Sequence, residues 1–117
     1  MKDDRLYLIH IHECLEHIEQ YTAEGKTHFF ADAKTQDAVL RNLQTLAEST
    51  QRLSPGLKAT HPDVDWQDIA AFRNVLVHDY LGINLVRVWE IIERHLPVLK
   101  QQIKAILKEL GEKPQVF

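Results

Sequence analysis

The chain has 117 residues, of which 44% are hydrophobic and 26% are charged, and its formal net charge is -3. A length of this order predicts one compact domain over residues 1–117, and the apolar content excludes a chain that stays largely disordered. Four glycines and four prolines are too few for the closely spaced turns of a sandwich or barrel, so the composition favours an all-α fold.

Cys14 is the only cysteine, which excludes an intrachain disulfide and a cluster of metal-binding thiolates. The first residues carry charges and only a short apolar run, unlike a signal peptide. No stretch approaches the roughly 20 apolar residues that cross a bilayer. The sequence therefore predicts a cytoplasmic protein that does not enter a membrane.

Apolar residues at helical spacing predict a first helix over about residues 3–21 and a second over about residues 32–53. Residues 23–31 contain Gly25 and the pair Phe29-Phe30, and we expect a loop with an apolar anchor there. We expect the Ser-Pro-Gly sequence at residues 54–56 to end the second helix.

A third helix is predicted to begin near Asp65, whose carboxylate can cap it, and to end around Tyr80. Gly82 suits the left-handed conformation that often follows the end of a helix. Asn84 then caps a fourth helical segment, in which apolar residues recur in a near-heptad stripe as far as Leu110.

Pro97 interrupts this last segment, and we expect a kink or a split into two helices there. Gly111 and Pro114 are expected to end the ordered part of the chain. Helices of these lengths with short connections predict an antiparallel bundle of four to five helices. The long C-terminal stripe has more apolar positions than its neighbours need, so we also expect a homodimer.

Seven histidines raise the question of a metal site. His10 and His12 are two residues apart on a predicted helix and therefore point about 200° away from each other, so they cannot bind the same ion. The other histidines show no better ligand spacing, and the sequence predicts no metal site.

The third predicted helix carries a group of polar residues near its end. Asn74 and His78 are four residues apart and share one face, while Arg73 can lean around Asn74 toward the same edge. A guanidinium offers fixed donors for a phosphate, an imidazole can transfer a proton near neutral pH, and an amide can fix the imidazole tautomer. These groups suit metal-free cleavage of RNA, in which the 2′-hydroxyl attacks the adjacent phosphate.

Spacing alone leaves a purely structural explanation open. Arg73 could pair with Asp68 or Asp79, and His78 could be a cation that the helix dipole favours at the C-terminus. Tyr80 could be an ordinary amphipathic aromatic at the end of a helix. Lys100, Lys104 and Lys108 form a row at helical spacing, which we interpret as a solvated face.

The sequence from Arg73 to Tyr80 resembles the Arg-x4-His-x-Tyr pattern of HepT-like toxins in the HEPN superfamily, and Asn74 supplies the polar residue typical after the arginine. The resemblance also includes residues 36–43, 61–70 and 88–97, and it extends over about residues 5–107. The pair Ala47-Glu48 departs from the Gly-Glu of many family members.

This resemblance implies an all-helical, dimeric endoribonuclease that needs no metal and acts as the toxin of a type VII toxin–antitoxin system. Arg73 and His78 match the catalytic residues. The implied antitoxin is a minimal nucleotidyltransferase of the MntA type, which transfers AMP from ATP onto the tyrosine at the position of Tyr80. The toxin itself would need no cofactor.

Two other functional classes fit the same predicted bundle. The chain could be a non-catalytic binding subunit of a nucleotidyltransferase complex, or a helical dimerisation module without chemistry. The three hypotheses differ in what they require of His78 and Tyr80.

Overall fold

The computed structural model describes residues 3–112, and these residues form helices and turns without a strand, which confirms the all-α class. The elements are α1 (Asp4–Tyr21), α2 (Lys26–Ala31), α3 (Ala33–Gln51), α4 (Pro55–Thr60), α5 (Trp66–His78), the 3-10 turn η1 (Tyr80–Gly82), α6 (Leu85–Glu90), the π-helical turn η2 (Ile91–His95) and α7 (Leu96–Glu112). Within the described residues, no helix is long and apolar enough to span a bilayer.

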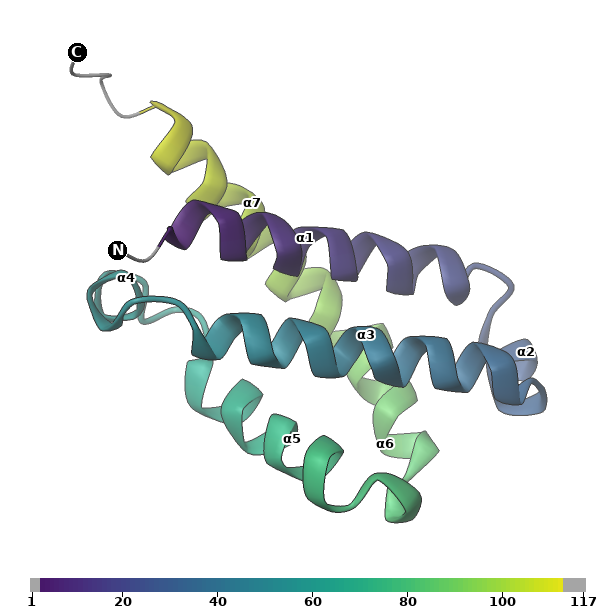
Figure 1. The fold of residues 1–117 in the computed structure, drawn as a ribbon. Coiled ribbons are helices and arrows are strands. Elements are labelled where there is room, and N and C mark those ends of the chain that lie inside the picture. The colour runs from purple at the N-terminus through teal and green to yellow at the C-terminus, as the bar shows by residue number, and fades with distance from the viewer. Residues whose placement is uncertain (1–2, 113–117) are drawn as a thin grey trace.

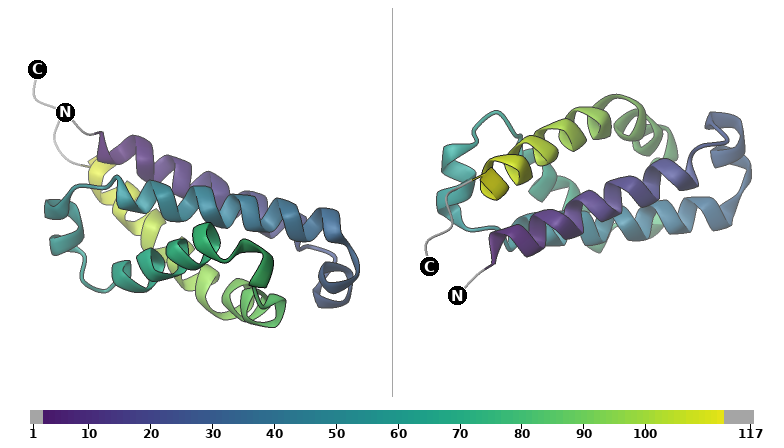
Figure 2. Two further views of the ribbon diagram at one scale, coloured as in Figure 1. Left: turned by 60° about the horizontal axis from the view of Figure 1, so that its bottom comes forward. Right: turned by 90° about the horizontal axis from the view of Figure 1, so that it is seen from above.

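The long helices α1 and α3 lie side by side and run in opposite directions (Figure 1). Helix α5 packs against α3, and α7 returns obliquely to pack against α1. The short helices α2 and α4 lie at opposite ends of the α1–α3 pair, as the further views in Figure 2 also show. The arrangement is the helical bundle expected from the sequence.

Capping side chains begin the principal helices where the sequence predicts. Asp3, Asp32, Asp65 and Asn84 each accept a hydrogen bond from a backbone N–H in the first turn of the helix that follows. The first turn of a helix has N–H groups without intrahelical partners, and a short polar side chain satisfies one or two of them. The starts of α1, α3, α5 and α6 are thus local features of the sequence.

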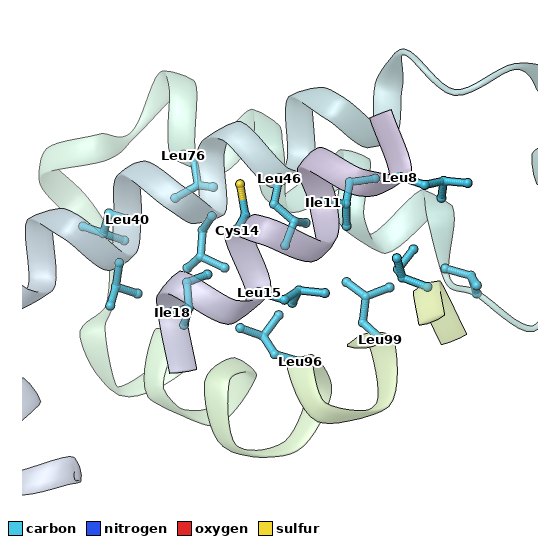
Figure 3. Close-up of a cluster of buried hydrophobic side chains, with 14 of the residues drawn as sticks. Leu8, Ile11, Cys14, Leu15, Ile18, Leu40, Leu46, Leu76, Leu96 and Leu99 are labelled. Carbon is cyan, nitrogen blue, oxygen red and sulfur yellow. The ribbon is translucent and has the colours of Figure 1, made fainter. Parts of the chain in front are cut away.

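The core forms where the apolar stripes of α1, α3, α5 and α7 meet (Figure 3). Its fully or nearly fully buried side chains include Leu8, Ile11, Leu15 and Ile18 of α1, Leu40 and Leu46 of α3, Leu76 of α5, and Leu96 and Leu99 of α7. Each buried leucine or isoleucine contributes about 1.5–3 kcal/mol by leaving water. Leu76 is only 1% exposed, so the core holds the end of α5 against α3.

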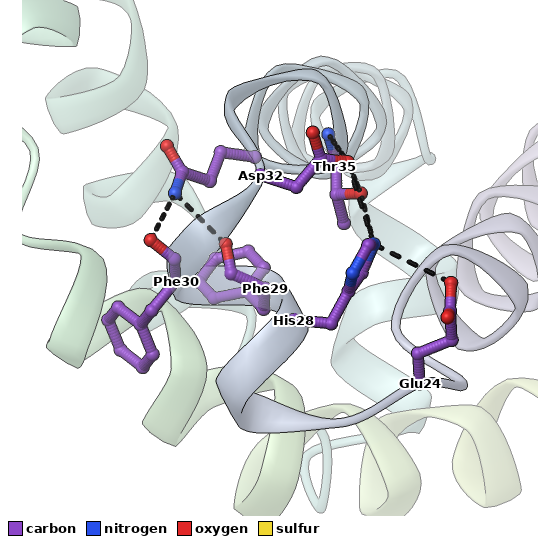
Figure 4. Close-up of polar contacts among 7 residues, drawn as sticks. Glu24, His28, Phe29, Phe30, Asp32 and Thr35 are labelled. Carbon is purple, nitrogen blue, oxygen red and sulfur yellow. Dashed lines mark hydrogen bonds and ion pairs between the residues drawn. The ribbon is translucent and has the colours of Figure 1, made fainter.

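Residues 23–31, expected to form a loop, contain the short helix α2 after Gly25 (Figure 4). Gly25 has a φ of 93°, a left-handed conformation that an L side chain rarely adopts. Phe29 is the expected apolar anchor and is completely buried. Gln36 of α3 donates to the carbonyl oxygens of Phe29 and Phe30 at 2.9 and 3.2 Å, which satisfies backbone groups that α2 leaves open.

The Ser-Pro-Gly sequence follows α3, as expected, but it also begins another helix, α4. The Ser54 hydroxyl accepts from the backbone N–H of Leu57, and Pro55 occupies the first helical turn, where its missing donor has no cost. A proline after a cap therefore marks a helix start here as well as a helix end.

Helix α5 ends at His78, two residues before the expected end, and Tyr80 begins the separate turn η1. The expectation that Gly82 adopts a left-handed conformation is wrong, because Gly25 is the residue with positive φ among those described. A Cβ atom on Gly82 would lie 2.5 Å from Oδ1 of Asp79. Gly82 thus leaves room for the carboxylate of Asp79.

The last helical segment is split, as predicted, but the irregularity precedes Pro97. Residues 91–95 form the π-helical turn η2, and α7 begins at Leu96 with Pro97 in its first turn. Because residues 85–112 are helical without a break, Pro97 removes one backbone donor from a continuous run, and the π-helical turn lies directly before it. Helix α7 continues through Gly111 to Glu112, so Gly111 does not end it, and Pro114 lies outside the described residues.

Candidate active site

Helix α5 positions three of the four residues that the sequence singles out. Its core face is anchored by the buried Leu76, and the half-buried Ile69 and Phe72 pack against the same core. The motif residues Asn74 and His78 are exposed on the other side. A continuous helix with one anchored face therefore presents the polar residues in a fixed register.

The Arg73 guanidinium leans toward Asn74, as the sequence predicts. Its Nη1 donates to Oδ1 of Asn74 at 3.3 Å, while its buried Nε has no hydrogen-bond partner in the structure. Among the described residues, Arg73 forms no ion pair with Asp68 or Asp79, the two partners that a structural role would require. The remaining guanidinium donors are therefore not committed to a carboxylate of the described chain.

His78 is the last residue of α5 and is exposed. In the described structure Oδ1 of Asn74 accepts a hydrogen bond from Arg73, and no hydrogen bond joins Asn74 to His78. The structure thus brings Asn74 together with Arg73, whereas His78 follows one helical turn beyond Asn74 on the same face.

Tyr80 opens η1 and contacts a residue that sequence reasoning missed. Its hydroxyl donates to Oδ1 of Asp37 in α3 at 3.5 Å. Burial, the negative charge of Asp37 and this hydrogen bond together raise the pKa of the Tyr80 phenol. The hydroxyl therefore keeps its proton at neutral pH, and Tyr80 as a whole residue is 41% exposed. The two residues are 43 positions apart, and no local spacing signals the contact.

A groove of about 700 Å³ lies between α5 and the segment from α6 to α7, with α3 as its floor. Apolar side chains line much of it, including Phe72 and Val75 of α5 and Leu99 of α7. Ala71 and Val75 in its wall share a helix face with Asn74 and His78, because residues at spacings of three, four and seven lie on one side of a helix. The groove therefore borders the motif.

The rim of this groove carries both signs of charge. Asp65 caps α5 and Asp68 lies in its first turn, while Arg87 of α6 and His95 of η2 also line the groove. The hydrogen bond and the negative charge of Asp65 raise the pKa of the Asp68 carboxyl, and the positive charges of Arg87 and His95 act in the opposite direction. A surface with such paired charges can complement a second copy of itself.

Metal-ligating side chains do not converge in the described part of the chain, where no group of three His, Cys, Asp or Glu residues could hold an ion. In the predicted lysine row of α7, Nζ of Lys100 lies 2.6 Å from Oε1 of Glu19 in α1. This ion pair ties two helices together. Lys100 is only partly exposed and so departs from the solvated face expected for the row, whereas Lys104 and Lys108 are exposed.

Residues 11–106 match the sequence model of the HepT-like family, which is described as "Ribonuclease HepT-like". The chain belongs to the ribonuclease HepT-like family. This match spans most of the chain and includes α5, η1 and the whole motif. The motif-based resemblance is therefore confirmed at the level of the family.

Named relatives agree with the family match. The HepT-like chain is 33% identical to a "Probable ribonuclease HepT" of Thermococcus cleftensis, over 87% of this chain and 94% of the relative. It is 34% identical to a "Putative RNase" of Caldanaerobacter subterraneus, over 93% of this chain and 98% of the relative.

A third relative, from Methanocaldococcus jannaschii, is named "Gamma-glutamylcyclotransferase and putative RNase" and is 35% identical over 95% of this chain. The chain spans about half the length of that protein, whereas it covers nearly all of the other two. No solved structure matches the chain significantly.

Proposed function

We propose that this chain is an endoribonuclease that cleaves RNA without a metal and acts in the cytoplasm as the toxin of a type VII toxin–antitoxin pair. The observation that carries the proposal is the Arg73 guanidinium, which forms no ion pair with a carboxylate of the described chain and lies five residues before the exposed His78. Membership of the ribonuclease HepT-like family supports the same activity.

In the proposed reaction, the ribose 2′-hydroxyl attacks the adjacent phosphorus and the bond from phosphorus to the 5′-oxygen breaks. One imidazole accepts the proton of the 2′-hydroxyl, and a second imidazolium donates a proton to the departing 5′-oxygen. Arg73 stabilises the added negative charge on the phosphoryl oxygens, for which its planar donors are suited. A cyclic phosphate and a 5′-hydroxyl result.

This reaction calls for two imidazoles, whereas the motif supplies one, His78. A homodimer would bring a second His78 to a shared cleft. The groove beside α5 supports this assembly, because its apolar wall and its rim of opposite charges can pair with the same surface of another copy. Asn74 and His78 share the helix face that borders the groove, so the two motifs would approach each other there.

We further propose that a minimal nucleotidyltransferase of the MntA type serves as antitoxin and transfers AMP from ATP onto Tyr80. The exposure of Tyr80, two residues after His78, supports access by such an enzyme. The attached AMP would add bulk and a negative phosphodiester where the RNA phosphate must bind. Toxin activity would then stop while Arg73 and His78 stay chemically unchanged.

Cleavage of a synthetic RNA by the purified chain in the presence of EDTA tests the nuclease. We expect His78→Ala to lower the cleavage rate by about 10² to 10⁴, the usual contribution of one acid–base group. Arg73→Ala should lower it by about 10² to 10³, the usual effect of losing a donor that stabilises developing negative charge. His10→Ala, which removes an exposed histidine of α1, should cleave at the wild-type rate. An RNA with a 2′-deoxy sugar at the cleavage site should stay intact.

Wild-type cleavage by His78→Ala would overturn the nuclease proposal. In that case the alternative, a non-catalytic binding subunit of a nucleotidyltransferase complex, predicts that the same variant still binds its partner and still accepts AMP on Tyr80. Intact mass spectrometry of the chain after co-expression with the nucleotidyltransferase measures this modification.

A further inference from the structure

We propose that Asp37 is a catalytic residue for the modification of Tyr80, and that its carboxylate accepts the proton which the phenolic hydroxyl loses during adenylylation. This inference rests on the proposed function, because it concerns a step in the transfer of AMP to this chain. The chain that receives AMP would thus supply the base for the reaction that inactivates it.

The contact joins two elements that the core holds in place. Asp37 lies in the first half of α3, while Tyr80 begins η1 directly after α5 and Asp79. Leu40, three residues after Asp37, and Leu76, four residues before Tyr80, are both buried in the common core. Their packing fixes the position of α3 relative to α5 next to the contact. The hydroxyl of Tyr80 therefore faces the Asp37 carboxylate before any partner binds, at 3.5 Å between the oxygens.

The hydroxyl requires a base at the moment of reaction. Partial burial and the nearby Asp37 carboxylate raise the pKa of the phenol, so its oxygen is a neutral, weak nucleophile at physiological pH. A phenol of this kind reacts faster when a positioned base removes its proton in the transition state. Asp37 already accepts the hydrogen bond along which that proton would move.

The step balances with a nucleoside triphosphate as the only co-reactant. The phenolic oxygen of Tyr80 forms a bond to the α-phosphorus, and the bond from that phosphorus to the bridging oxygen of the leaving pyrophosphate breaks. The proton passes from the phenolic oxygen to the Asp37 carboxylate and then to solvent. The product is a phosphodiester between the tyrosine and the nucleoside, with pyrophosphate released.

Asp37→Asn separates this role from a merely structural one. An asparagine side chain has nearly the same shape, and its carbonyl oxygen can still accept the hydrogen bond from Tyr80, but it does not take up a proton at neutral pH. Asp37→Glu keeps a carboxylate near the hydroxyl. Glu13→Gln is the matched control, because it removes one exposed carboxylate from α1 instead of α3.

The experiment measures the initial rate of AMP attachment to the purified full chain by a minimal MntA-type nucleotidyltransferase with ATP and Mg²⁺, followed by intact mass spectrometry between pH 7 and pH 10. We expect Asp37→Asn to be at least about tenfold slower than wild type at pH 7. Asp37→Glu should recover part of this loss, and Glu13→Gln should match wild type.

The ratio of the wild-type rate to the Asp37→Asn rate should shrink as the pH rises. Without the carboxylate, the phenol loses its proton to solvent more readily at high pH, so the variant depends less on a base. Because both chains meet the same transferase, the pH dependence of that enzyme cancels in the ratio. Thermal unfolding of each variant verifies that the chains compared are folded.

Equal rates for wild type and Asp37→Asn would overturn the inference and leave the proposed function standing. A rate loss that is constant across the pH range would also overturn it, because that result assigns Asp37 a positioning role alone. If wild type itself gains no AMP, or if Tyr80→Phe gains as much, the proposed function fails at an earlier point, and the inference fails with it.

Discussion

The phenyl ring of Phe29 and the indole ring of Trp89 lie with their centroids 5.3 Å apart and their planes tilted by 38°. This contact joins the short helix α2 to α6, two elements that Figure 1 shows at the same end of the molecule. Neither helix is long enough to be stable alone, so tertiary contacts hold each in place, and the aromatic contact is one that they share. The pair therefore helps to hold α6 in place, and α6 contributes Arg87 and Val88 to the lining of the groove.

We expect Phe29→Ala to lower the free energy of unfolding by about 3–5 kcal/mol, because it removes a completely buried ring and leaves a cavity. Phe30→Ala is the matched control, since Phe30 is the next residue of α2 but is 36% exposed. Urea denaturation of the two variants measures the difference. A loss for Phe30→Ala as large as that for Phe29→Ala would contradict the assignment of Phe29 as the anchor.

The cap of α3 makes a pH dependence of stability testable. The Thr35 hydroxyl donates to Oδ2 of Asp32 at 2.6 Å, and this bond is the largest of the effects that lower the pKa of the Asp32 carboxyl. A carboxyl with a lower pKa in the folded state stabilises that state above its unfolded pKa of about 3.9, and the contribution disappears as the pH falls through the folded pKa.

We therefore expect stability to fall as the pH is lowered from about 5 into the acid range, and Thr35→Val to weaken this dependence. Thr45→Val, which removes an exposed hydroxyl from the same helix, is the control. Urea denaturation at several pH values gives the slopes. The assignment fails if Thr35→Val and Thr45→Val show the same dependence of stability on pH as wild type.

The proposed dimer interface predicts a specific loss of assembly. Val75 lies in the groove wall and is 44% exposed, as is Leu6 on α1. Val75→Asp would place a carboxylate in an apolar interface, and we expect it to convert a wild-type dimer into a monomer and to abolish RNA cleavage. Leu6→Asp makes the same change at equal exposure and should leave both properties intact.

Sedimentation equilibrium measures the mass in solution, and the RNA assay measures activity on the same samples. A Val75→Asp chain that stays dimeric would place the interface elsewhere. A wild-type chain that is monomeric but cleaves RNA would contradict the shared cleft itself.

The sequence predicted the principal helices well because helix caps and apolar stripes depend on residues that are close together in the chain. Asp32 and Asn84 cap helices through backbone N–H groups only two or three residues away, so tertiary structure is not needed for these bonds. An apolar stripe marks the buried face of a long helix. The one-turn helices α2 and α4 were missed because each contains one buried apolar residue, which is too few to show a period.

The candidate site was predictable only where it is continuous in sequence. The lean of Arg73 toward Asn74 follows from their adjacency on one helix and is confirmed. The contact of Asp37 with Tyr80 depends on how α5 packs against α3, so no spacing along the chain could indicate it. The prediction that Gly82 is left-handed was wrong because a glycine can also occur where another group lies too close for a Cβ atom. At Gly82 that group is the Asp79 carboxylate.

The π-helical turn at residues 91–95 makes the effect of a deletion depend on its place in the chain. Such a turn accommodates one residue more than an α-helical turn, so deleting a single residue there would let the segment relax to regular helix. Helix α7 would then keep its register, and Leu96, Leu99 and Ile103 would stay in the core. The same deletion within α7 has no extra residue to remove, so every residue after it would rotate by about 100° away from its present direction. Loss of one residue is therefore far better tolerated in residues 91–95 than in the regular helix that follows.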